Sequence, residues 1–202
     1  MRLIDAFDQI ALIRQQVARA EMFRGYRAGT TALSGVVAIA ASHLTSRLQA
    51  ERGCTDEQYL MIWCSAAVLC LAVLAVDIAW RQRREPSALQ RDLTVSAIEH
   101  FMPSLAAGLL LTLVLFQFAF EVVWMLPGLW MILFGLGIHA SRRLLPRFSG
   151  LIAGYYIASG LFVLSLREWA AFNPWTMGAV FGLGQFMAAG LLRFQEGRGH
   201  EA

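Results

Sequence analysis

The chain has 202 residues, of which 57% are hydrophobic, and its mean hydropathy is +0.54. These values exclude an intrinsically disordered chain and do not fit an ordinary soluble domain. All 17 basic residues are arginine, against 14 acidic residues. Because the arginines flank apolar stretches instead of forming a basic face, no nucleic-acid partner is predicted.

The first 27 residues are predicted to form a cytoplasmic amphipathic helix. Apolar residues recur in it every three or four positions, and charged residues mostly take the other side. Such a helix can lie in the lipid interface, pack on the end of a helix bundle, or dock a partner protein. The candidate docking residues are Phe7, Ile10, Ile13 and Val17.

Six apolar stretches of 18 to 21 residues follow, and each predicts a transmembrane helix. At about 1.5 Å per residue, such a helix crosses a hydrocarbon core of about 30 Å. The sequence therefore predicts an all-α, polytopic transmembrane bundle over residues 28–194, followed by a cytoplasmic tail at 195–202. The predicted spans are 28–48, 60–80, 102–120, 127–145, 149–166 and 174–194.

The arginines give the bundle one predicted orientation. The segment before the first span, the loops at 81–101 and 141–148 and the tail, counted together with Arg193 at the end of the sixth span, hold 14 of the 17 arginines. By the positive-inside rule both termini are cytoplasmic, in a bacterial inner membrane. The external connections are then 49–59, about 121–126 and 167–173.

Prolines mark the predicted start of three spans. Asn173 is a predicted N-cap, with Pro174 in the first turn of the sixth span. Pro127 is assigned the same first-turn position in the fourth span, and Pro103 in the third.

Glycines suggest where helices approach one another. Phe134-Gly135-Leu136-Gly137 in the fourth span recurs as Phe181-Gly182-Leu183-Gly184 in the sixth, which suggests repeated hairpins. Small residues line one stripe of the fifth span and one of the sixth, so close packing of these two spans is predicted, with self-association through an outward-facing stripe as the alternative. The packing residues are Gly150, Gly154, Gly178 and Gly182.

Polar residues within or beside the spans are candidates for function. Asp77, Glu99, His100 and His139 are all predicted near the cytoplasmic ends of spans two to four. Together they could hold a transition metal or relay a proton, and ordinary ion pairing is the alternative. His43 and His139 differ in depth by roughly 15 Å, too far for one shared haem.

Two glutamines complete the candidates. Gln185 lies near the middle of the sixth span and Gln117 near the outer end of the third. Each can join helices by a hydrogen bond, and together with His43 and His139 they are candidates to line a transport path.

Enzyme motifs for nucleophilic, phosphate-binding or zinc chemistry are absent from the sequence. The run from Ile13 to Ala20, followed by Leu33-Ser34-Gly35, and the late Phe181-Gly182-Leu183-Gly184-Gln185-Phe186 resemble an uncharacterised family of small six-span bacterial membrane proteins. That family often has His where Gln185 stands. The resemblance implies the six-span fold and no activity.

Three functional interpretations follow. The first is a non-catalytic membrane protein that acts through protein partners, as an accessory subunit or a membrane-bound regulator. The second is a small oligomeric transporter or channel. The third is a metal- or haem-containing membrane enzyme that uses the Asp77 group. No cofactor is predicted under the first two.

Overall fold

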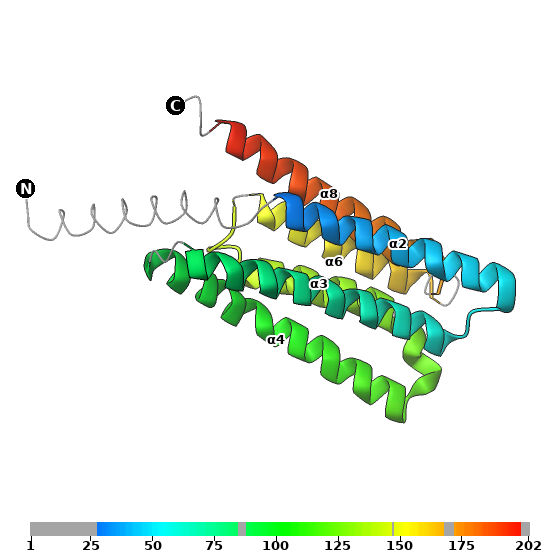
Figure 1. The fold of residues 1–202 in the computed structure, drawn as a ribbon. Helices are drawn as coiled ribbons and strands as arrows, with labels where there is room; N and C mark the ends of the chain where they lie inside the picture. Colours follow the sequence, from blue (N-terminus) through cyan, green and yellow to red (C-terminus); the bar gives the residue numbers. More distant parts are fainter. Residues whose placement is uncertain (1–27, 85–87, 147, 168–171, 199–202) are drawn as a thin grey trace, which may run out of the picture.

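The structure is a computed structural model that describes residues 28–84, 88–146, 148–167 and 172–198. All regular structure in these ranges is helical, as predicted, and it forms one elongated bundle (Figure 1). The predicted amphipathic helix at 1–27 and the end of the tail lie outside the described residues. The elements are α2 (Ala28–Arg52), α3 (Asp56–Arg84), α4 (Ala88–Phe118), the 3-10 helix η1 (Phe120–Met125), α5 (Leu126–Ala140), α6 (Ser149–Ser165) and α8 (Pro174–Arg198).

Five segments of the described residues are long and apolar enough to cross a membrane. They run over Ala28–Glu51, Asp56–Trp80, Thr94–Phe118, Phe120–Ala140 and Pro174–Phe194. The predicted fifth span, 149–166, is instead the shorter apolar helix α6, of 17 residues. The predicted count of six long spans is therefore corrected to five long helical segments and one shorter helix.

Two predicted boundaries are wrong. The third span was predicted to begin at residue 102, but α4 begins at Ala88 and contains Pro103 in its interior. No Gly or Pro lies between Ala88 and Phe101 to end a helix there, and hydropathy marks the apolar part of a helix, not its ends. Most of the predicted 81–101 loop is therefore helical.

The fourth span was predicted to reach residue 145, but α5 ends at Ala140. Successive turns follow, in which the Leu144 N–H donates to the Ser141 carbonyl at 2.9 Å. Pro146 disfavours helical geometry in the residue before it, which explains why the apolar Leu144-Leu145 pair does not prolong the helix.

The connections 53–55, η1 and the residues before α8 lie at one end of the bundle, here called the hairpin end (Figure 1). The chain reverses at Gly53, whose φ of +71° favours glycine. Thr55 and Gln58 then form a capping box at the start of α3. The Thr55 N–H donates to Gln58 Oε1 at 3.2 Å, and the Gln58 N–H donates to Thr55 Oγ1 at 3.3 Å. The predicted Asn173 cap of α8 is confirmed, because its Oδ1 accepts the Trp175 N–H at 2.9 Å.

Two antiparallel helix pairs form the tight part of the bundle. In the first pair α8 lies along α2, and an added Cβ at Gly35 would lie 3.3 Å from Gln185. In the second pair α5 lies along α6, where an added Cβ at Gly160 would be only 2.5 Å from the Gly128 carbonyl oxygen. Glycines thus set the backbone separation in both pairs.

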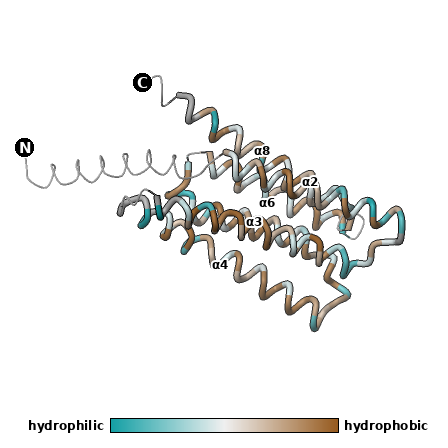
Figure 2. The backbone as a smooth tube through the Cα atoms, in the orientation of Figure 1, coloured by the Kyte–Doolittle hydropathy of each residue, from teal (hydrophilic) through white to brown (hydrophobic). Residues whose placement is uncertain are grey.

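The helices α3 and α4 form a looser layer beside these pairs. No residue from Thr94 to Phe118 is buried, and none from Cys64 to Trp80. The side chains left exposed are large and apolar, as with Val76 at 69% and Leu109 at 63%. Figure 2 shows that hydrophobic residues run along the middle of these helices, while hydrophilic ones gather toward the ends.

Hydrogen bonds and close packing attach α4 to α5 and to the residue that follows it. Trp130 Nε1 donates to Thr112 Oγ1 at 2.9 Å, and the buried Ser141 hydroxyl donates to the Ala97 carbonyl at 3.1 Å. Between them, Gly137 faces the ring of Phe101, which a Cβ atom would approach to 2.5 Å.

Substitution of Gly160 by Ala should destabilise the bundle, because the new methyl group meets a backbone carbonyl that cannot rotate away. We expect a loss of about 1–3 kcal/mol, as for other overpacked contacts. Gly154→Ala is the matched control, since nothing lies within 4 Å of that position and Ala gains about 1 kcal/mol of helix propensity. Unfolding of the two purified variants in detergent measures the difference, and equal stabilities would contradict the α5–α6 contact.

Candidate functional site

The four predicted acidic and histidine residues do not form a metal site. Among the described residues, no group of three or more His, Cys, Asp or Glu side chains is placed to hold a metal ion. Glu99 and His100 are exposed on α4, and His139 is exposed near the end of α5. His100 Nδ1 lies 2.7 Å from the Ser96 carbonyl oxygen, one turn back on its own helix. Similar depth along the bundle did not bring these side chains together into a metal-binding group.

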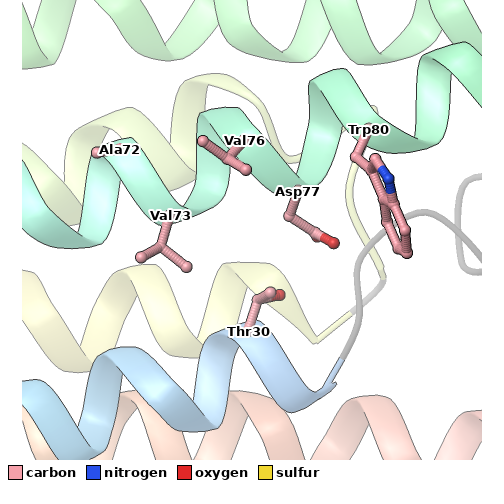
Figure 3. Close-up of a pocket in the computed structure, with 6 residues that line it drawn as sticks. All are labelled: Thr30, Ala72, Val73, Val76, Asp77 and Trp80. Atoms are coloured by element: carbon pink, nitrogen blue, oxygen red, sulfur yellow. The ribbon is translucent and has the colours of Figure 1, made fainter.

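Asp77 lies alone among the four in a groove between α3 and α2. Figure 3 shows Asp77 and Val73 of α3 directed toward Thr30 of α2, with Trp80 one turn further along α3. The groove holds about 560 Å³ and its remaining lining residues, Ala72 and Val76, are aliphatic. A single carboxylate in this groove does not supply the three or four ligands that a transition-metal site requires.

Gln185 makes the predicted connection between helices. Its Nε2 donates to the Tyr156 hydroxyl at 3.2 Å, and that hydroxyl donates to the Phe181 carbonyl at 3.5 Å. The neighbouring Tyr155 hydroxyl donates to the Val180 carbonyl at 3.1 Å. Two adjacent tyrosines of α6 therefore bind two adjacent carbonyls of α8.

Aromatic rings surround this hydrogen-bonded connection. Tyr156 is fully buried, and its ring centroid lies 4.8 Å from that of Phe134 and 5.1 Å from that of Phe181. The absence of a side chain at Gly184 makes room for Tyr156, because an added Cβ would lie 2.5 Å from its hydroxyl oxygen. Polar groups here are satisfied by one another, so they stabilise the bundle and leave no open path.

The repeated Phe-Gly-Leu-Gly sequences take corresponding places in the two helix pairs. Phe134 and Phe181 meet at 5.4 Å between ring centroids. Gly135 of α5 faces Ala153 and Ile157 of α6, and Gly182 of α8 faces Gly35 and Ile39 of α2. In both pairs a glycine thus packs on a small residue and on an isoleucine four positions later. The repeat is used twice for the same kind of packing.

Gln117 and His43 lie on the surface of the bundle. Both side chains are exposed, Gln117 on α4 and His43 on α2. Neither faces the aromatic interior around Tyr156, so the described structure does not assemble them with Gln185 into a polar path. The docking candidates Phe7, Ile10, Ile13 and Val17 lie outside the described residues.

The predicted glycine contact between α6 and α8 is not formed. Gly150 and Gly154 are exposed and have nothing within 4 Å of an added Cβ. Gly178 and Gly182 pack instead on α2, where Gly178 faces Ser42 and Ala38. Spacing identified small-residue stripes on both helices, but the stripe on α6 points away from the bundle.

Sequence reasoning missed the two tyrosines that join α6 to α8, of which Tyr156 also binds Gln185. The signal available was a Tyr155-Tyr156 pair in the middle of an apolar stretch, because buried hydroxyl groups require hydrogen-bond partners. Their partners are 25 to 29 residues away in the chain, and no pattern within α6 identifies them.

Comparisons with protein-family models, with curated proteins and with solved structures find no match to this chain. The site must therefore be interpreted from its own geometry.

Removing either partner of the Gln185–Tyr156 hydrogen bond should destabilise the bundle modestly. For Gln185→Leu and Tyr156→Phe together, a double-mutant cycle should give a coupling of about 0.5–1 kcal/mol. Unfolding in detergent measures it. Gln117→Leu is the control, because that side chain is exposed. Additive effects of the two substitutions would show that the bond contributes nothing to stability.

Proposed function

We propose that this chain is an integral membrane protein of a bacterial inner membrane that acts by associating with another protein, as an accessory subunit or a regulator. Membrane insertion is supported by the exposed apolar side chains of α3 and α4, which water would solvate poorly. Lipid can cover such helices, since their backbone polar groups are satisfied internally.

The observation that carries the association proposal is the outward face of α6. Gly150, Gly154 and Ala158 are spaced by one turn and are all exposed, and Leu161 beside them is 56% exposed. Many other glycines of the helices already pack against a neighbouring helix of the same chain, namely α2, α4, α5 or α6. In lipid, an open stripe of small residues lets a second helix approach closely and gain dispersion contacts.

The interior favours this proposal over transport. The side chains of Thr45, Ser141 and Gln185, which are buried or half-buried, have hydrogen-bond partners on the helices. Large aromatic rings fill the space between the two helix pairs. A path for a solute would require these contacts to separate.

The proposed orientation places both termini in the cytoplasm and the hairpin end outside. It is supported by the arginines at the opposite end, among them Arg83, Arg142 and Arg193, which are all exposed.

A cysteine at the hairpin end, Cys54, allows a test of the proposed orientation. Burial raises the pKa of the Cys54 thiol above its ordinary 9.0, and the nearby Asp56 carboxylate raises it further.

Affinity purification in mild detergent, followed by mass spectrometry, should recover a stoichiometric partner with the wild-type chain. Gly154→Leu should reduce that recovery about tenfold, because the added side chain blocks close approach at a cost of about 1.4 kcal/mol. Gly190→Leu is the matched control, since Gly190 is also exposed and has nothing within 4 Å. Equal recovery with both variants would contradict docking on α6.

A parallel variant separates a membrane partner from a cytoplasmic one. Replacement of Phe7, Ile10 and Ile13 by Ser should abolish recovery only if the amphipathic segment docks the partner. Recovery of this chain alone, as a defined oligomer, would replace the accessory role with self-association.

With Cys64 and Cys70 replaced by Ala, a membrane-impermeant maleimide should label Cys54 from outside the cell and not from the cytoplasmic side. Only the thiolate reacts, so below pH 9 the rate should rise about tenfold per pH unit without a plateau. Asp56→Asn lowers the pKa and should speed labelling at a fixed pH. Labelling from the cytoplasmic side would reverse the proposed orientation.

A further inference from the structure

A second cavity lies at the hairpin end, and its walls come from three separate segments. Asp56 begins α3, Phe172 precedes α8, and four residues of η1 complete the lining: Phe120, Glu121, Val123 and Trp124. The cavity holds about 300 Å³, at the lower end of the range for small-molecule sites. We propose that it binds a small organic cation, whose ammonium group lies between the two carboxylates and the aromatic rings.

Charge is the first argument for a cationic ligand. Asp56 and Glu121 both line the cavity. Arg47 and Arg167, the arginines at this end whose side chains the structure describes, are not among the lining residues. Two carboxylates that share a partly enclosed space repel each other, and a bound cation relieves that repulsion.

The aromatic residues are an independent argument, and they select the kind of cation. Phe120, Trp124 and Phe172 are three of the six lining residues, and their ring faces attract an ammonium group through its charge. Calcium instead needs six to eight oxygen ligands, which this lining does not offer. The combination of ring faces with carboxylates is suited to an alkylated or primary ammonium ion.

Packing holds two of these rings in place before any ligand binds. The Phe172 ring makes an edge-to-face contact with the buried Tyr59 at 5.3 Å, and Phe120 makes one with Phe116 at 5.7 Å. Val123, which is 2% exposed, closes the floor of the cavity. The rings are already held in place, so the site is preorganised and little conformational entropy is lost when a ligand binds.

This inference does not depend on the proposed partner. The lining residues are different from those of the α6 stripe, and binding can be measured on the purified protein in detergent. In the proposed orientation the cavity opens outside the cell, so the small organic cation would be an external one.

Titration of the full-length protein with choline, followed by calorimetry and tryptophan fluorescence, tests the proposal. We expect saturable binding, weakened at least about fivefold by Glu121→Gln and by Trp124→Leu. The control variant is Glu57→Gln, which removes an exposed acid next to Asp56 that does not line the cavity. The uncharged isostere 3,3-dimethylbutan-1-ol should bind much more weakly than choline.

Three results would overturn the proposal. One is the absence of saturable binding of choline, tetramethylammonium and ethanolamine to the wild-type protein. Another is equal binding of choline and its uncharged isostere, which would make the cavity a simple apolar site. The third is calcium binding that Trp124→Leu leaves unchanged. The wild-type titration decides the first two results, so a variant that fails to fold does not leave the question open.

Discussion

Close approach of helix backbones at glycine is the constraint on which the rest of this structure depends. In a lipid environment, burial of apolar side chains gives no advantage over contact with acyl chains, so helices associate through dispersion and hydrogen bonds at short range. The pairs α2–α8 and α5–α6 meet this condition at Gly178 and Gly160, where even a methyl group would not fit. Once both pairs are fixed, Phe134, Tyr156 and Phe181 are brought together between them.

The same constraint explains why α3 and α4 are peripheral. Neither helix brings a glycine into backbone contact with a neighbour, and the one glycine of α4, Gly108, would meet only the end of the Leu133 side chain, at 3.7 Å. Their attachment relies on a few side chains, such as Trp130 on Thr112, and on short connections at the hairpin end.

Hydropathy and length predicted the helical architecture, because both are properties of each stretch by itself. The ends of the helices were harder to predict. The more polar segment 88–101 continues α4 beyond its apolar part, and Pro103 lies inside the helix. Rotation about the helix axis could not be predicted at all. Gly154 and Gly178 have similar sequence surroundings, yet one faces outward and the other packs on Ser42. The Asp77 group shows the same limit, since its residues share a similar depth in the sequence pattern but do not form a metal-binding group.

The distribution of polar groups indicates where the function of this bundle lies. Gln185 donates a hydrogen bond to Tyr156 of the neighbouring helix, so it stabilises the packed bundle. Most of the described arginines lie toward one end of the bundle, and Asp56 and Glu121 lie at the other. Under the proposed function, ions and protein partners are recognised at the surface of the bundle, and the packed interior holds that surface in position.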